Sequence, residues 1–158
     1  MRMGVRLGID YGGARIGVAA CDPQATVAIP LQVVPTSKYG EDVEEVAQIA
    51  ADRDAIEIVV GYPRHMSGKT GASARAARKF ARELAHAYPR ARVALVDERL
   101  TSVQAHSLLA AGEVSGRERK GKVDPLAAAI ILETALESER SSGKPPGETV
   151  SRGAAAGG

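Results

Sequence analysis

The sequence contains little sulfur and few aromatic rings. It has one cysteine, no tryptophan and one phenylalanine among its 158 residues. The single Cys21 cannot form an internal disulfide, which excludes the class of small secreted domains held together by disulfides. With 3% aromatic and 44% hydrophobic residues, the core has to be aliphatic and closely packed, an arrangement that suits helices lying on a sheet.

Long apolar runs are also missing. The best one, residues 126–132, is far shorter than the roughly 20 residues that cross a bilayer. The N-terminal residues 1–6 carry neither the apolar stretch nor the cleavage pattern of a secretory signal. We therefore expect a cytoplasmic protein with no membrane partner. Its length fits one globular domain over residues 1–140, followed by a disordered tail rich in Ser, Gly and Pro over 141–158.

The net charge is only +2, but the charges are unevenly distributed along the chain. Residues 41–57 hold seven acids and one base, whereas residues 64–92 hold eight bases and one acid. The sequence therefore predicts a polarised molecule with a basic region for an anionic partner.

Hydrophobic periodicity predicts an α/β fold with a five-stranded mixed sheet flanked by helices. Strands are expected over 5–10 and 16–21 as a hairpin, then over 26–34, 56–61 and 93–97. Pro30 places the third strand at an edge or at a bulge. Helices are expected over 41–53, 72–88, 101–111 and 124–140, the last with Asp124 as its cap and Pro125 in its first turn.

Three acidic residues stand where strands end or helices begin. Asp10 ends the first strand, Glu98 follows the strand over 93–97, and Asp124 opens the last helix. Such ends meet at one edge of an α/β sheet, where three carboxylates would repel one another without a cation. Mg²⁺ or Mn²⁺ would bind these oxygens and support hydrolysis of a phosphodiester bond. The pattern predicts a metal-dependent nuclease.

The neighbouring Asp97 competes with Glu98 for the metal site. Side chains alternate faces along a strand, so only one of the two points into the cluster, and we choose Glu98. Asp124 is also explained as a helix cap, a role that is compatible with metal binding. His65 is either a proton donor or a solvated loop residue, and Cys21 is either a reduced structural thiol or a cross-link between chains.

Four sequence motifs in order resemble the YqgF/RuvX family. They are residues 10–17 (DYGGARIG), 61–63 (GYP), 97–101 (DERLT) and 122–128 (KVDPLAA). The resemblance implies a ribonuclease H-like fold related to Holliday junction resolvases and a bacterial role in maturing the 5′ end of pre-16S ribosomal RNA, with junction resolution as the alternative. It also matches Asp10, Glu98 and Asp124 to acidic catalytic positions, and Arg15 and Arg99 to basic ones. The loop 64–68 departs from the family pattern, with Ser67 where Asp or Asn is common.

Basic residues recur at helical spacing over 75–82. Arg75, Arg78, Lys79 and Arg82 fall on one helix face, which we call the basic stripe, and few acidic partners lie one turn away. Further phosphate contacts are expected from the basic residues outside it, chiefly Lys69, Arg117, Arg119, Lys120 and Lys122. We expect structured RNA or branched DNA as the partner, bound by a monomer or a homodimer.

Two rival functions remain open at this stage. A non-catalytic nucleic-acid-binding module would keep the basic stripe but gain nothing from the acidic trio. An ATP-binding protein of the actin-like fold shares an opening hairpin with Asp and Gly, yet needs two lobes, which 158 residues do not supply. Residues 68–70 (GKT) mimic the end of a P-loop, but Pro63 stands where its first glycine is required.

Overall fold

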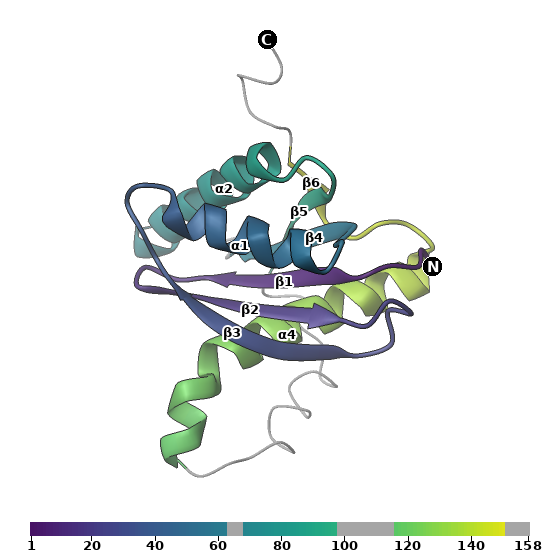
Figure 1. Ribbon diagram of the computed structural model, residues 1–158, viewed down its shortest axis with the longest axis horizontal. Helices are drawn as coiled ribbons and strands as arrows, with labels where there is room; N and C mark the ends of the chain where they lie inside the picture. Colours follow the sequence, from purple (N-terminus) through teal and green to yellow (C-terminus); the bar gives the residue numbers. More distant parts are fainter. Residues whose placement is uncertain (63–67, 98–115, 151–158) are drawn as a thin grey trace.

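The computed structural model describes residues 1–62, 68–97 and 116–150, and the side chains within these ranges except those of 68–70 and 116–124. The elements in chain order are β1 (Arg6–Tyr11), β2 (Arg15–Cys21), β3 (Ala28–Pro35), α1 (Glu41–Asp52), β4 (Glu57–Tyr62), α2 (Gly68–Ala87), β5 (Arg92–Asp97), α4 (Gly116–Ser142) and β6 (Glu148–Thr149). Figure 1 shows α1 and α2 on one side of the sheet and α4 on the other. None of the helices in these ranges is long and apolar enough to span a bilayer.

The sheet is mixed and has the order β3-β2-β1-β4-β5-β6. β1 pairs with β2 antiparallel, as the expected hairpin, and with β4 parallel. β4 pairs with β5 parallel, whereas β6 runs antiparallel at the far edge. The α/β class and the mixed sheet are confirmed, with β6 added to the five expected strands.

The third strand is both an edge strand and a bulged one. β3 lies at the rim of the sheet and pairs only with β2 among the strands. The register shifts between Val18 and Ala19, which pair with Gln32 and Pro30 and leave Leu31 as the extra residue. Pro30 has no backbone N–H for a ladder hydrogen bond, and edge strands and bulges tolerate this loss, so both expectations for this proline are confirmed.

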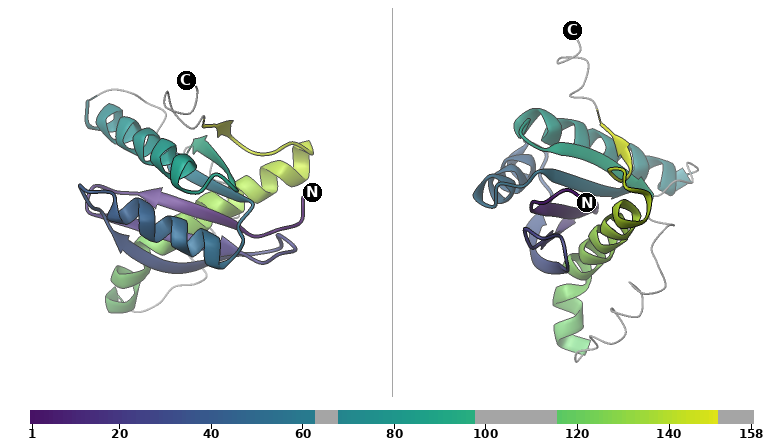
Figure 2. Two further views of the ribbon diagram at one scale, coloured as in Figure 1. Left: turned by 45° about the horizontal axis from the view of Figure 1, so that its top comes forward. Right: turned by 90° about the vertical axis from the view of Figure 1, so that its right-hand side faces the viewer.

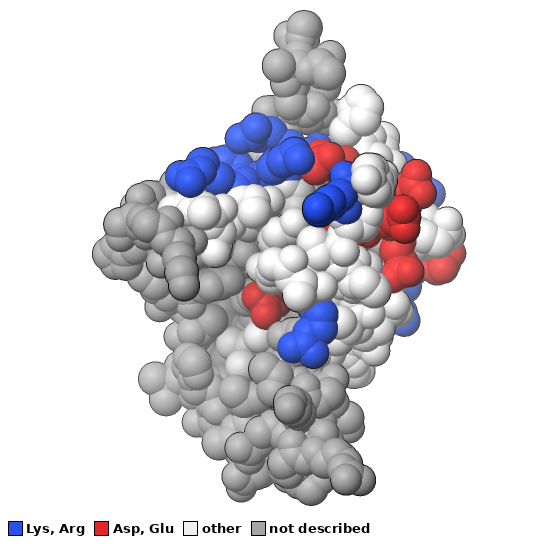
Figure 3. All heavy atoms as spheres, turned by 90° about the vertical axis from the view of Figure 1, so that its left-hand side faces the viewer, with Lys and Arg blue, Asp and Glu red and all other residues white. Residues whose placement is uncertain are grey.

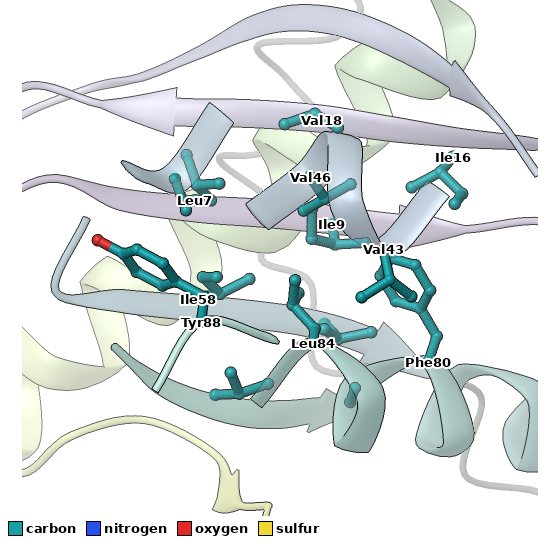
Figure 4. Close-up of a cluster of buried hydrophobic side chains, with 14 of the residues drawn as sticks. Leu7, Ile9, Ile16, Val18, Val43, Val46, Ile58, Phe80, Leu84 and Tyr88 are labelled. Atoms are coloured by element: carbon teal, nitrogen blue, oxygen red, sulfur yellow. The ribbon is translucent and has the colours of Figure 1, made fainter. Parts of the chain in front are cut away.

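Two apolar clusters lie on the two faces of the sheet. The larger one joins alternate residues of β1, β2 and β4 to α1 and α2, including Leu7, Ile9, Val46, Phe80 and Leu84 (Figure 4). The smaller one joins Val59 and Val96 to one side of α4. Figure 2 shows the sheet enclosed between these layers. Alternation along the strands therefore assigns Leu7, Ile9 and Tyr11 to the first face and the residues between them to the face of α4.

The last helix begins earlier than the sequence indicates. Residues 116–123, which precede the helix expected over 124–140, are already helical, so Asp124 does not cap the helix and Pro125 lies inside it. Proline lacks a donor and bends a helix, and Figure 1 shows α4 changing direction near its start. The expectation that Asp124 opens the helix is wrong. The helix expected over 101–111 lies outside the described residues.

Residues 141–150 are ordered where a disordered tail was expected. α4 continues to Ser142, and β6 adds to the edge of β5. The Arg92 guanidinium donates to the carbonyl oxygens of Pro146 and Gly147, at 2.7 and 3.2 Å. These contacts hold the segment against the sheet. Residues 151–158 lie outside the described residues.

Candidate functional site

Asp10 lies near the carboxyl end of β1 between two glycines. Its partners in the sheet register are Gly17 on β2 and Gly61 on β4. Residues paired across strands point to the same face, so neither neighbour places a side chain beside the Asp10 carboxylate. Asp10 is half-buried, and its strand position belongs to the face of α4. On this face of the sheet, both positions next to Asp10 are therefore occupied by glycines.

α4 crosses β1 in the opposite direction and at short range. A β-carbon built at Gly8 would come within 2.6 Å of the Ala128 carbonyl oxygen and 2.7 Å of the Leu132 β-carbon. Nearer the start of β1, the Arg6 guanidinium donates to Glu139 at 3.2 Å. Residue numbers thus fall along α4 as they rise along β1. The part of α4 that precedes Ala128 therefore lies toward the end of β1 that carries Asp10, and the helix bends there at Pro125, directly after residue 124.

The third predicted acid lies beyond the described residues. β5 ends at Asp97, which is buried and pairs with Tyr62. Tyr62 packs with the cluster under α1 and α2, whereas Asp97 also borders a cavity that is lined by Val96 and by Thr134 and Ala135 of α4. Glu98 and Arg99 follow outside the described ranges. Within those ranges, no group of three potential metal-binding side chains lies together.

The glycine-rich turn after Asp10 holds Arg15 at the surface. The Gly12 amide donates to the Arg15 carbonyl oxygen at 3.0 Å, and a β-carbon at Gly12 would come within 2.6 Å of that oxygen. Thr36, directly after β3, secures the turn, because its hydroxyl donates to the Gly12 carbonyl oxygen at 3.1 Å. Arg15 begins β2 and is exposed. It is therefore presented beside the end of β1.

The basic stripe lies on α2 as its spacing predicts. Arg75, Lys79 and Arg82 are exposed, and the buried residues of α2 lie on other faces of the helix. Arg78 is half-buried, with its guanidinium over the Tyr62 ring and 3.4 Å from Glu148. Figure 3, which views the side where β1 ends, shows basic side chains gathered along α2 and acidic ones on the flank of α1. The uneven distribution of charge along the sequence thus gives a surface with a basic region on α2 and an acidic region on α1.

The other residues singled out in the sequence lie partly within and partly outside the described residues. Lys69 begins α2, and Lys120 and Lys122 lie in the early turns of α4, where only the helical backbone is described. His65 lies outside the described residues. Cys21 is buried, and its sulfur accepts the Arg6 amide at 3.2 Å. Burial raises the pKa of this thiol, so Cys21 is a packed neutral group rather than an exposed cross-linking one.

A buried ion network lies at the opposite end of β1. Glu139 of α4 accepts from Arg2 at 2.6 Å and from Arg6 at 3.2 Å. Glu57 of β4 accepts from Arg2 and Arg92, both at 2.8 Å. Hydrogen bonds from Arg2 lower the pKa of Glu139 from 4.5 to about 2. The network fixes the far end of α4 against the sheet. Sequence reasoning missed it, although charges in the apolar strands at Arg6 and Glu57 signal buried pairing.

Similarity to known proteins covers most of the chain. The RuvX family, described as Holliday junction resolvase, matches residues 4–138. A Clavibacter sepedonicus protein named "Putative pre-16S rRNA nuclease" is 46% identical over 153 residues, covering 96% of this chain and 94% of that protein. A Streptomyces coelicolor protein of the same name is 45% identical over 150 residues, covering 95% of this chain and 90% of its own length.

A solved structure shares the fold. T. thermophilus RuvC, in complex with a Holliday junction substrate, superposes with a TM-score of 0.60 at 19% sequence identity, covering 88% of this chain and 96% of that chain. The ribonuclease H-like fold expected from the four motifs is thereby confirmed. By the match of its sequence over residues 4–138 and its identity to curated relatives, the chain belongs to the RuvX family.

Proposed function

We propose that this chain is a metal-dependent endonuclease that hydrolyses phosphodiester bonds in structured nucleic acid. Its carboxylate ligands are Asp10, Glu98 and Asp124. The observation that carries the proposal is the antiparallel crossing of α4 over β1 at Gly8. The crossing directs the turn before Ala128, which includes residue 124, toward the strand end of Asp10. Two acids that are 114 positions apart in the chain thus belong to converging elements.

The strand register brings the end of β5, which Glu98 follows in the sequence, to the neighbourhood of Asp10. Asp10, Gly61 and Val96 are successive partners across β1, β4 and β5, and therefore share the face of α4. Gly61 places no side chain between Asp10 and Val96. Glu98 comes two positions after Val96 in the sequence and matches the acidic position of the family motif, which supports it as the third ligand.

The proposed ligands fit a hard divalent cation. Carboxylate oxygens are the donors that Mg²⁺ and Mn²⁺ prefer, and the sheet partners on both sides of Asp10 are glycines, which place no side chain beside its carboxylate. Once bound, Mg²⁺ or Mn²⁺ would supply a Lewis acid that stabilises the charge developing on the phosphate. Asp10, Glu98 and Asp124 hold the cation, while Arg15 and Arg99 contact the phosphodiester backbone. The basic stripe, Lys69, Lys120 and Lys122 orient the rest of the substrate through its phosphates.

The substrate we propose is the 5′ region of pre-16S ribosomal RNA. The curated relatives carry that activity in their name, whereas the family description names Holliday junctions, which makes a four-way DNA junction the alternative. Cutting a junction on opposed strands requires a two-fold dimer, whereas trimming an RNA end requires one site. The buried thiol of Cys21 suits the reducing cytoplasm, where we propose that the enzyme acts.

The deciding experiment compares Asp10→Asn with the wild-type protein on both substrates. Asp10→Asn is expected to abolish Mg²⁺-dependent cleavage while binding stays equal or tightens, because a negative charge next to phosphate is removed. Asp52→Asn, which changes an exposed acid on α1, is the matched control and should cut normally. Oligomeric state is measured in the same buffer. Normal cleavage by Asp10→Asn would refute the site, and wild-type binding without cleavage would indicate a non-catalytic module.

A further inference from the structure

A cavity of about 430 Å³ opens at the carboxyl end of β1, on the face covered by α1 and α2. We call it the Tyr11 pocket. It is bordered by β1, by the segment between β3 and α1, and by α2. The lining residues that matter for its chemistry are Tyr11, Lys38, Asp42, Ala76, Lys79 and Phe80. Apart from Lys79, none of them belongs to the proposed nuclease centre, and the volume is that of a small-molecule site.

An aromatic surface forms one wall of the pocket. The Tyr11 and Phe80 rings lie 4.9 Å apart between centroids and are tilted by 40°. Phe80 is buried, whereas Tyr11 is half-buried and offers part of its ring to the cavity. Ala76, one turn before Phe80 on α2, is small and leaves that wall open. A planar apolar group can stack there, as nucleic-acid bases do on tyrosine.

The opposite wall is held rigidly by hydrogen bonds. The Thr36 amide donates to the Ala14 carbonyl oxygen at 3.1 Å, which joins the segment before α1 to the β1–β2 turn. The buried Asp42 carboxylate accepts the amides of Ser37 at 3.1 Å and Val43 at 2.8 Å. The pocket is therefore formed before any ligand arrives, which lowers the entropic cost of binding.

The charges of the lining suit a nucleotide rather than a simple anion or a hydrocarbon. Lys38 and Lys79 are exposed and border the pocket from two different elements, as a phosphate between them would require. Asp42 lies deeper, with both carboxylate oxygens already accepting backbone amides, whereas Glu83 is exposed on the rim. The Glu83 carboxylate accepts hydrogen bonds only, and so suits the N–H groups of a base. The Tyr11 hydroxyl adds a hydrogen-bond donor to the lining.

The position of the pocket links it to a nucleic-acid strand. Tyr11 follows Asp10 directly, so the pocket and the proposed metal site lie on opposite faces of the same strand end. Lys79 belongs both to the pocket and to the basic stripe. A strand that follows the stripe would pass the pocket on its way around the end of β1 to Asp10.

We propose that the Tyr11 pocket binds one nucleotide of the substrate strand next to the bond that is cut. The base stacks on Tyr11 with its N–H groups toward Glu83, and its phosphate lies between Lys38 and Lys79. This proposal rests on the proposed nuclease function for its location, but binding can be measured without cleavage. The pocket would add recognition of an unpaired base to the backbone contacts of the basic stripe.

The test fills the pocket and measures binding of a fluorescent single-stranded oligoadenylate by anisotropy in EDTA. Ala76→Leu places a larger side chain in the cavity and is expected to weaken binding about tenfold. Ala87→Leu, an exposed position three turns later on α2, is the matched control and should leave binding unchanged. Lys38→Gln combined with Lys79→Gln should weaken binding severalfold and lower the salt slope by about 0.7. Lys144→Gln changes an exposed lysine beyond α4 and should leave both the affinity and the salt slope unchanged.

Each outcome decides the proposal. Wild-type affinity in Ala76→Leu, with its fold verified by thermal unfolding, would overturn it. If that variant does not fold, the exposed lysine pair decides alone, and unchanged binding in the pair would overturn it. Adenosine monophosphate binding as tightly as the oligomer, with the same sensitivity to Ala76→Leu, would assign the pocket to a free nucleotide instead. Because EDTA removes cleavage from the measurement, failure of the nuclease activity would leave these binding results standing.

Discussion

Gly8 on β1 lies directly against Ala128 on α4, with no space for a β-carbon between the strand and the helix. This contact sets how α4 crosses the sheet, and we propose that it thereby orients the turn containing residue 124 toward Asp10. Gly8 is required there for the close approach of two backbones rather than for an unusual dihedral angle. The placement of one proposed ligand thus depends on a glycine that is not itself in the site.

Gly8→Ala is expected to push α4 away from β1. Overpacking of this kind costs about 1–3 kcal/mol of unfolding free energy, and the displaced helix should lower cleavage more than binding. Gly13→Ala is the control, because a β-carbon there meets nothing within 4 Å, and its stability should stay within about 0.5 kcal/mol of the wild type. Urea unfolding and cleavage assays measure both effects. A fully stable and active Gly8→Ala protein would contradict the role of this contact.

A second glycine pair tests the docking of β6. Gly143 and Gly147 both have left-handed backbones, at φ +73° and +71°, but only Gly147 lies close to other atoms, notably the Leu95 carbonyl oxygen. Gly143→Ala should cost about 1 kcal/mol from the backbone alone. Gly147→Ala should cost at least about 1 kcal/mol more, because β6 must also move off β5. Equal melting temperatures for the two variants would show that β6 contributes nothing.

Acid sensitivity should depend on Glu139. Hydrogen bonds from Arg2 hold its pKa near 2 in the folded chain, below the ordinary 4.5. The unfolded chain therefore takes up the proton more readily, so the stabilisation is complete above about pH 4.5 and is lost as the pH falls toward 2. Glu139→Gln should lose about 3 kcal/mol at neutral pH and show a flatter stability profile below about pH 5. Glu45→Gln, an exposed acid on α1, should keep the wild-type profile.

Salt dependence of binding should report on the basic stripe. The double variant Arg75→Gln, Arg82→Gln removes two exposed cations from α2 and should reduce the slope of log affinity against log salt by about two. Removing two exposed arginines elsewhere, with Arg53→Gln and Arg90→Gln, changes the net charge equally and should leave the slope near that of the wild type. Equal slopes for the two double variants would show that α2 does not contact phosphates.

Local sequence patterns predicted the helices and strands whose positions depend only on their own residues. The hairpin follows from two apolar runs around Gly12 and Gly13, and the edge position of β3 follows from Pro30. α1 matches its apolar periodicity to within one residue at its end. The position of Asp10 at the end of β1 was likewise predictable, because it depends on the strand alone.

The features that were missed depend on distant contacts. β6 has only two residues and owes its place to Arg92, whose guanidinium binds the carbonyl oxygens before it. The early start of α4 overrides a proline pattern that usually marks a helix N-terminus. The Tyr11 pocket joins three segments, and neither Lys38 nor Asp42 shows any pattern that signals it. Local periodicity in a sequence does not indicate which distant segments come into contact.

The two rims of the sheet have a further consequence for how copies of this chain behave at high concentration. An open sheet can recruit strands from other molecules and grow into aggregates. Here the edge strand β3 is interrupted by Pro30 and a register shift, and the edge strand β6 has only two residues. Neither offers a long, regular row of free backbone groups. The molecule can therefore keep an open sheet while remaining protected against edge-to-edge polymerisation.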